Sequence, residues 1–226
     1  MSLAIFDLDN TLLGDDSDYL WGQFLVQQGL VDGEFYTREN QRFYKDYQTG
    51  QLDILEFLAF SLKPLSKHPR EKLDALHRQF MQEVITPMML PAAHLLLEKH
   101  RAQGDTLLII TATNSFITAP IAAALGVENL LATEPEIVHD RYTGQVSGTP
   151  CFQAGKVERL KTWLHDNRQN LADSWFYSDS HNDLPLLEWV THPVAVDPDE
   201  TLADHATAKG WPVITLRGEI PAPMET

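Results

Sequence analysis

Two aspartates lie close together near the N-terminus, Asp7 and Asp9 in the run DLDNTL. They directly follow the apolar run Leu3–Phe6, whose length and composition predict a buried strand. Open α/β sheets hold their ligands at the carboxyl ends of their strands, so two carboxylates at that position are candidate active-site groups. An Asx-rich turn that caps the next segment would explain the same residues without any chemistry.

A second acidic loop follows the apolar run Trp175–Tyr177 and reads SDSHND from Ser178 to Asp183. It again presents carboxylates, those of Asp179 and Asp183, at the end of a predicted strand. The alternative is a short polar loop that opens a helix, with Asn182 or Asp183 as its N-cap.

A hydroxyl and a lysine complete the candidate set. Thr111 follows Thr106–Ile110, the most apolar predicted strand, and a hydroxyl there can bind an oxyanion or cap a helix. Lys156 lies in the first turn of a helix predicted over Ala154–Asn167. A lysine is unfavourable at the positive end of the helix dipole, so its position there indicates a functional role. Each of these signals is ordinary by itself, but their combination in one chain is not.

Alternating strands and helices must position these residues. Buried strands of a parallel sheet covered on both faces are predicted at Leu3–Phe6, Thr106–Ile110, Trp175–Tyr177 and Val194–Val196. A fifth apolar run, Val213–Leu216, closes the chain. Helices are predicted at Pro91–Gln103, Ala154–Asn167, Asp183–Val190 and Asp199–Lys209. The alternation from residue 91 onward predicts an α/β, doubly wound core.

Residues 14–86 interrupt this alternation. Apolar residues recur there at helical spacing, which predicts about four helices and no clear strand. We therefore expect an all-helical insertion after the first strand. A smaller irregularity lies at Leu130–Phe152, where the run DRYTG between two β-prone segments predicts a hairpin.

Taken in order, the DxDxT motif, the strand-terminal threonine, the lysine at a helix start and the DSxxD-type loop resemble the haloacid dehalogenase superfamily. Within it, the chain is similar to the phosphatase branch related to phosphoserine phosphatase, over essentially its whole length. The resemblance implies a Rossmann-like catalytic core with a parallel sheet, formed by residues 1–13 and 87–226. It also implies that residues 14–86 are the helical cap domain of that family.

The resemblance assigns a role to each candidate residue. Asp7 would be the nucleophile that forms an aspartyl-phosphate, and Asp9 the general acid and then base. The expected cofactor is Mg²⁺, held by the carboxylates of Asp7 and Asp179 and the backbone carbonyl of Asp9, with Asp183 as a water-mediated partner. Thr111 and Lys156 would bind the phosphoryl oxygens. The second carboxylate of the motif argues for phosphoester hydrolysis over dehalogenation.

The same resemblance points to a small, amine-bearing substrate. Ala112 and Asn182 match positions at the phosphate site, and Asp16 matches an acidic residue that receives a substrate ammonium group. Solvated loop acids are the alternative for Asp16. The chain looks most like family members that act on histidinol phosphate in three segments, Phe6–Gly14, Ile110–Asn114 and Pro150–Phe152. Phosphoserine is the alternative substrate and would need a cation for its carboxylate, for which the candidates are Arg38, Arg42, Lys45 and Lys63. A phosphotransferase and a non-catalytic phosphate-binding protein are further alternatives.

The composition limits the partners of the chain. Its 226 residues hold 17 Lys and Arg against 32 Asp and Glu, a net charge of −15. This charge argues against nucleic-acid and anionic-membrane partners. The single cysteine, Cys151, excludes an intrachain disulfide framework. The first residues do not show the basic start and long apolar run that are typical of a signal peptide. We therefore expect a cytoplasmic monomer, whose anionic substrate binds very weakly without Mg²⁺ because the chain itself is acidic.

Overall fold

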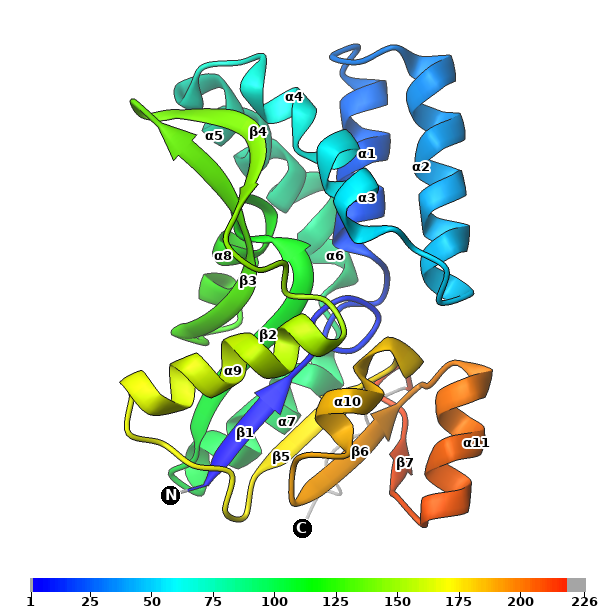
Figure 1. Cartoon of the computed structure of the whole chain (residues 1–226), viewed down its shortest axis with the longest axis vertical. Coiled ribbons are helices and arrows are strands. Elements are labelled where there is room, and N and C mark those ends of the chain that lie inside the picture. The colour runs from blue at the N-terminus through cyan, green and yellow to red at the C-terminus, as the bar shows by residue number, and fades with distance from the viewer. Residues whose placement is uncertain (1, 219–226) are drawn as a thin grey trace, which may run out of the picture.

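The sheet at the centre of the molecule has seven strands in the order β4-β3-β2-β1-β5-β6-β7 (Figure 1). This computed structural model describes residues 2–218. The strands are β1 (Leu3–Phe6), β2 (Thr106–Asn114), β3 (Asn129–Val138), β4 (Arg141–Ser147), β5 (Trp175–Ser178), β6 (His192–Val196) and β7 (Val213–Ile214). All neighbouring pairs are parallel except β3 and β4, which are antiparallel. The five predicted strands and their parallel arrangement are therefore confirmed, although the run Val213–Leu216 forms a strand only over Val213–Ile214.

Successive residues of the central strands point to opposite faces of the sheet, and each face is covered by helices. Ala4 and Phe6 of β1 belong to one apolar cluster, together with α7 (Pro91–Ala102) and α8 (Ser115–Ala124). Leu3 and Ile5 belong to the other apolar cluster. That cluster includes α9 (Ala154–Asp166), α10 (Leu184–Leu187) and α11 (Glu200–Lys209). The fold is thus the predicted α/β, doubly wound, Rossmann-like core, and its all-apolar strands follow from burial on both sides.

The helices between β1 and α7 lie on the side of the carboxyl ends of the central strands, where the β3–β4 hairpin reaches up beside α4 (Figure 1). They are α1 (Ser17–Gln27), α2 (Gly33–Gln48), α3 (Ile54–Ser61), α4 (Lys63–Ser66), α5 (Arg70–Phe80), the π-helical turn Met81–Ile85 and α6 (Thr86–Met88). No strand interrupts residues 14–86. Leu13 and Met89 form an isolated antiparallel bridge where the chain leaves the core and returns to it. The division into a core (1–13 and 87–226) and a helical cap (14–86) remains a proposal, and the bridge between Leu13 and Met89 supports it.

Two local predictions need correction. The strand predicted to end at Ile110 continues to Asn114, because Asn114 pairs with Thr133 of β3 after a register shift. Thr111 therefore lies within β2 and does not follow it. The helix predicted over Asp183–Val190 is shorter, a 3₁₀ turn at His181–Asp183 followed by α10, and it ends where the N–H of Trp189 bonds only three residues back, to the Leu186 carbonyl.

The predicted hairpin is present as β3 and β4, but its turn was misplaced, because Arg141–Gly144 of the run DRYTG lie within β4 and not between the strands. His139 and Asp140 join the two strands, and both have positive φ angles, as a tight hairpin turn requires. Within residues 2–218, no helix is long and apolar enough to cross a membrane.

Candidate active site

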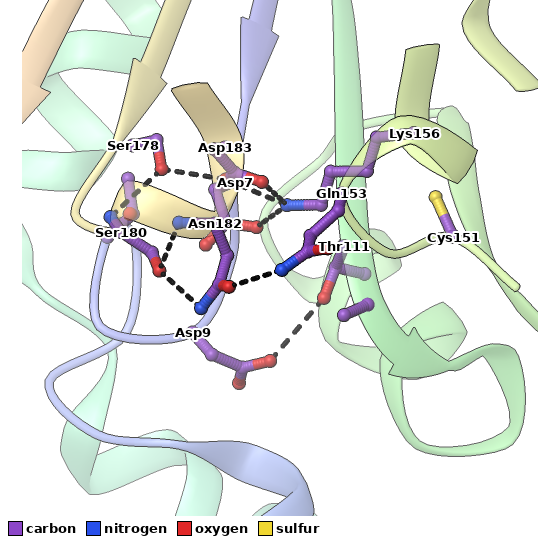
Figure 2. Close-up of polar contacts among 12 residues, drawn as sticks. Asp7, Asp9, Thr111, Cys151, Gln153, Lys156, Ser178, Ser180, Asn182 and Asp183 are labelled. Atoms are coloured by element: carbon purple, nitrogen blue, oxygen red, sulfur yellow. Dashed lines mark hydrogen bonds and ion pairs between the residues drawn. The ribbon is translucent and has the colours of Figure 1, made fainter. Parts of the chain in front are cut away.

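The first loop of the site places Asp7 beside Lys156 at the end of β1. Lys156 Nζ donates to Asp7 Oδ1 at 2.7 Å and to Asp183 Oδ2 at 2.8 Å. All three side chains are buried. Figure 2 shows the lysine amine between the two carboxylates. The ammonium group of Lys156 thus links the start of α9 to the end of β1 and to the loop after β5.

Gly155 explains how Lys156 reaches this position. A Cβ at residue 155 would lie 2.1 Å from the backbone oxygen of Pro150, so only glycine allows the chain to pass there. Gln153, just before α9, has a φ of 47°, which turns the chain sharply into the helix. This turn places Lys156 in the first turn of α9, where its amine contacts the carboxylates of Asp7 and Asp183.

Asp9 is held by donors from two directions. The backbone N–H of Ser17 donates to its Oδ1 at 2.7 Å, and the hydroxyl of Thr113 donates to its Oδ2 at 2.8 Å. Thr111 lies at 3.4 Å from the same oxygen. Sequence reasoning missed Thr113. The available signal was its spacing of two from Thr111, which puts both hydroxyls on one face of a strand.

The loop after β5 brings in the other two acids. Asp179 Oδ1 accepts from the Thr11 hydroxyl at 3.1 Å, so the DxDxT motif also fixes this second loop. Asp183 Oδ2 accepts from Ser178 at 2.7 Å. The cap of the short helix is Ser180, whose side chain accepts from the N–H of Asn182. Asp183 occupies the N-cap position of α10 but makes no side-chain cap hydrogen bond, so capping does not explain its carboxylate.

Burial dominates the electrostatics of these acids. It raises the pKa of Asp7 to about 7, with Lys156 opposing this shift and Asp183 adding to it. Burial also raises the pKa of Asp9, against the hydrogen bonds from Ser17 and Thr113. It raises the pKa of Asp179 well above its usual value, helped by Asp7 and Asp183. Burial by itself would lower the pKa of Lys156, but Asp183 and Asp7 raise it overall.

The model of the haloacid dehalogenase-like hydrolase family matches residues 4–188, which include all of these groups. The chain belongs to this family. A histidinol-phosphatase from Neisseria meningitidis is 46% identical over 220 residues, which cover 96% of this chain and 99% of that relative. Phosphatase is therefore the enzyme class of this chain.

Solved structures agree with this placement. A protein of unknown function from Bordetella pertussis superposes with a TM-score of 0.90 at 46% identity, covering 95% of this chain and 98% of that one. A substrate-bound phosphoserine phosphatase superposes with a TM-score of 0.68 at 18% identity, covering 96% and 93% of the two chains. The second likeness supports the haloacid dehalogenase fold alone.

The donors of this haloacid dehalogenase-like site suit a hard cation. The carboxylates of Asp7 and Asp179 and the backbone carbonyl of Asp9 are oxygen ligands of the kind Mg²⁺ prefers. The mutual repulsion that helps raise the pKa of Asp179 is the charge excess that a divalent cation would relieve. Asp183 is bound to Lys156 and Ser178 instead. Within residues 2–218, no three His, Cys, Asp or Glu side chains form a ready-made metal cluster. The expected magnesium set thus depends on a backbone oxygen.

Two predicted substrate residues have structural partners of their own. Asp16 is the N-cap of α1, and its Oδ1 accepts from the N–H of Tyr19 at 2.8 Å. Asp16 is half-buried, and burial, followed by the charge of Asp9, raises its pKa well above its usual value. Its role toward a substrate ammonium group remains a prediction. Asn182 accepts from Gln153 and donates to the backbone oxygen of Tyr47 on α2. A role for Asn182 at the phosphate remains a prediction.

A cavity of about 570 Å³, including its open mouth, connects the catalytic acids with the helices above them. Acids and hydroxyls line one end, and aromatic and apolar side chains line the walls. The lining residues are Asp7, Asp9, Asp16, Asp18, Tyr19, Asn40, Phe43, Tyr44, Tyr47, Leu52, Ile54, Phe57, Thr111, Ala112 and Thr113. None of these lining residues is lysine, arginine or histidine.

Proposed function

We propose that this phosphatase hydrolyses the phosphate ester of a small amino alcohol, with L-histidinol phosphate as the leading candidate. The observation that carries this proposal is the cavity, because it joins Asp7 to two further carboxylates, Asp16 and Asp18, with no basic side chain on its walls. Such a cavity favours a substrate that is cationic away from its phosphate. The name of the relative from Neisseria meningitidis is consistent with it.

The proposed reaction begins with attack by an Asp7 oxygen on phosphorus. The bond from Asp7 to phosphorus forms while the bond from phosphorus to the ester oxygen breaks. Lys156 holds Asp7 in position for this attack and neutralises charge that develops on the phosphoryl group. Thr111 and the backbone near Ala112 lie on the cavity wall beside Asp7, where they would hold phosphoryl oxygens.

Asp9 would act first as the general acid and then as the general base. Burial raises its pKa, which makes its protonated form available to donate to the leaving alcohol oxygen. The same carboxylate then accepts a proton from the water that attacks the aspartyl-phosphate, and this attack releases phosphate and restores Asp7. The hydrogen bonds from Ser17 and Thr113 would hold Asp9 in position for both proton transfers, to the leaving alcohol and from the attacking water.

Mg²⁺ held by Asp7, Asp179 and the Asp9 carbonyl would neutralise charge on the phosphoryl oxygens. Without it the acids repel an anionic ester, so we propose that substrate binding depends on the cation. We also propose that the protein is a monomer and that it is located in the cytoplasm, which is a reducing compartment.

Phosphoserine is the less favoured substrate because its carboxylate finds no cation in the cavity. Arg38 and Arg42 form ion pairs with Glu39, and Arg42 also contacts Asp46 and Glu56 at the surface. Neither arginine lines the cavity. Lys45 and Lys63 do not line it either.

Turnover of para-nitrophenyl phosphate tests the reaction apart from the choice of substrate. We expect activity with Mg²⁺, its loss on chelation, and its loss in Asp7→Asn. Acid quenching during turnover should trap a phosphoryl group on the wild type and none on Asp7→Asn. Full activity without a divalent cation, or in Asp7→Asn, would refute the proposed mechanism.

A further inference from the structure

The first turn of α1 supplies a second acid to the cavity, Asp18, which the reaction does not use. It is 7% exposed, and its Oδ2 is buried without a hydrogen-bond partner among residues 2–218. Asp16, by contrast, uses one carboxylate oxygen to cap α1. Asp18 is thus a cavity-lining acid with unused acceptor capacity.

The surroundings of Asp18 do not compensate its charge. Burial and the nearby charge of Asp9 raise its pKa to about 7, and no cation contributes to the shift. Tyr36 of α2 lies near enough for Asp18 to raise the tyrosine pKa, yet Asp18 Oδ2 accepts no bond from it. A buried acceptor without a donor costs free energy, which folding alone does not explain. Because Asp18 also lines the cavity, a ligand there can supply the missing donor, and an acid with a perturbed pKa in such a cavity is a candidate functional group.

Flat aromatic surfaces lie on the same cavity. The rings of Tyr19 and Tyr44 are 4.8 Å apart, and those of Phe43 and Phe57 are 5.3 Å apart. All four rings line the cavity together with Asp18. A ligand group that suits both features is planar and carries an N–H donor.

Resting on the function proposed above, we propose that Asp18 is a specificity-determining residue that accepts a hydrogen bond from a ring N–H of an imidazole-bearing substrate. Asp16 keeps the substrate ammonium group. Two carboxylates and an aromatic wall then match two nitrogen centres and a flat ring. The competing arrangement, in which both acids share one ammonium group, requires no ring.

Four phosphate monoesters separate these arrangements. They carry an amine and an imidazole (L-histidinol phosphate), an amine alone (2-aminopropyl phosphate), an imidazole alone (3-(imidazol-4-yl)propyl phosphate), or neither (propyl phosphate). Each is assayed with wild type, Asp18→Asn and Asp16→Asn. Asp74→Asn, which removes an exposed acid of α5 in the same helical insertion (residues 14–86), is the charge-matched control.

We expect Asp18→Asn to lower kcat/KM about 10-fold to 100-fold for the two imidazole esters and less than about threefold for the others. Asp16→Asn should give its losses with the two amine esters. Equal losses of Asp18→Asn with all four esters, losses that follow the amine, or no loss would overturn the assignment of Asp18. Wild type that prefers neither amine nor imidazole esters over propyl phosphate would instead refute the proposed substrate, and the assignment with it.

Stability provides a readout that separates recognition from a structural role. If Asp18 serves a ligand, Asn at this position removes an uncompensated buried charge, and the urea midpoint at pH 8 should equal or exceed that of wild type. A lower midpoint together with equal losses on all esters would identify Asp18 as a structural residue.

Discussion

Lys156 Nζ lies 2.7 Å from Asp7 Oδ1, although the two residues are 149 positions apart in the chain. The same amine contacts Asp183, so it joins the loops after β1 and β5 through the start of α9. Because all three side chains are buried, the folded core and the catalytic carboxylate depend on the same cation.

Replacing Lys156 with Met should therefore damage both activity and stability. We expect kcat/KM for para-nitrophenyl phosphate to fall by about 10² to 10³, and the free energy of unfolding to fall by about 3–5 kcal/mol, since two buried carboxylates lose their partner. Steady-state kinetics and urea unfolding measure the two effects. Lys161→Met, an exposed position on the same helix, is the control. Activity of Lys156→Met within threefold of wild type would contradict this role.

Thr113→Val tests how Asp9 is positioned. The hydroxyl donates to Asp9 Oδ2 at 2.8 Å, so its loss should lower kcat about tenfold and change KM little. Thr118→Val removes a buried hydroxyl that bonds only to the Asn114 carbonyl, and it should leave kcat unchanged. Equal kcat values for the two variants would show that Thr113 does not act through Asp9.

Gly155→Ala tests the start of α9. Because a Cβ there meets the Pro150 oxygen at 2.1 Å, the backbone must shift and carry Lys156 with it. We expect a loss of about 2 kcal/mol or more in unfolding free energy and a fall in kcat. Gly33→Ala is the matched control, since its nearest neighbour lies at 3.5 Å. A fully active and stable Gly155→Ala protein would contradict the close approach.

His77 predicts a pH dependence of stability. Burial lowers its pKa, against a hydrogen bond to the Ile117 carbonyl, so the folded protein binds this proton less readily than the unfolded chain. Its contribution is present above the unfolded value of 6.5 and is lost as the pH falls through the lowered pKa. The urea midpoint of wild type should thus decline more steeply below pH 6.5 than that of His77→Gln. His165→Gln, an exposed control, should decline as wild type does; parallel curves for wild type and His77→Gln would refute the effect.

Much of the core could be predicted because it depends on local patterns. Four-residue apolar runs such as Leu3–Phe6 are buried on both faces, and acids directly after them must lie at the carboxyl edge. The end of β2 was missed because the pairing of Asn114 with Thr133 depends on a neighbouring strand. For the same reason Thr111 was placed after the strand.

The parts that sequence reasoning missed depend on distant contacts. Asp18 is one of several acids in a polar run, and only the packing of α1 against α2 shows that it is buried and unpartnered. Thr113 gains its role from contact with Asp9, which is 104 residues away. The absence of a cation on the cavity walls likewise follows from where Arg42 finds its acidic partners.

The most direct test of the proposed function is the ratio of kcat/KM for L-histidinol phosphate to that for L-phosphoserine, measured with Mg²⁺ on the wild-type protein. A cavity with two acids besides the catalytic pair and no lysine, arginine or histidine on its walls should favour histidinol phosphate by about 100-fold or more. A ratio of one or below would contradict the proposed substrate.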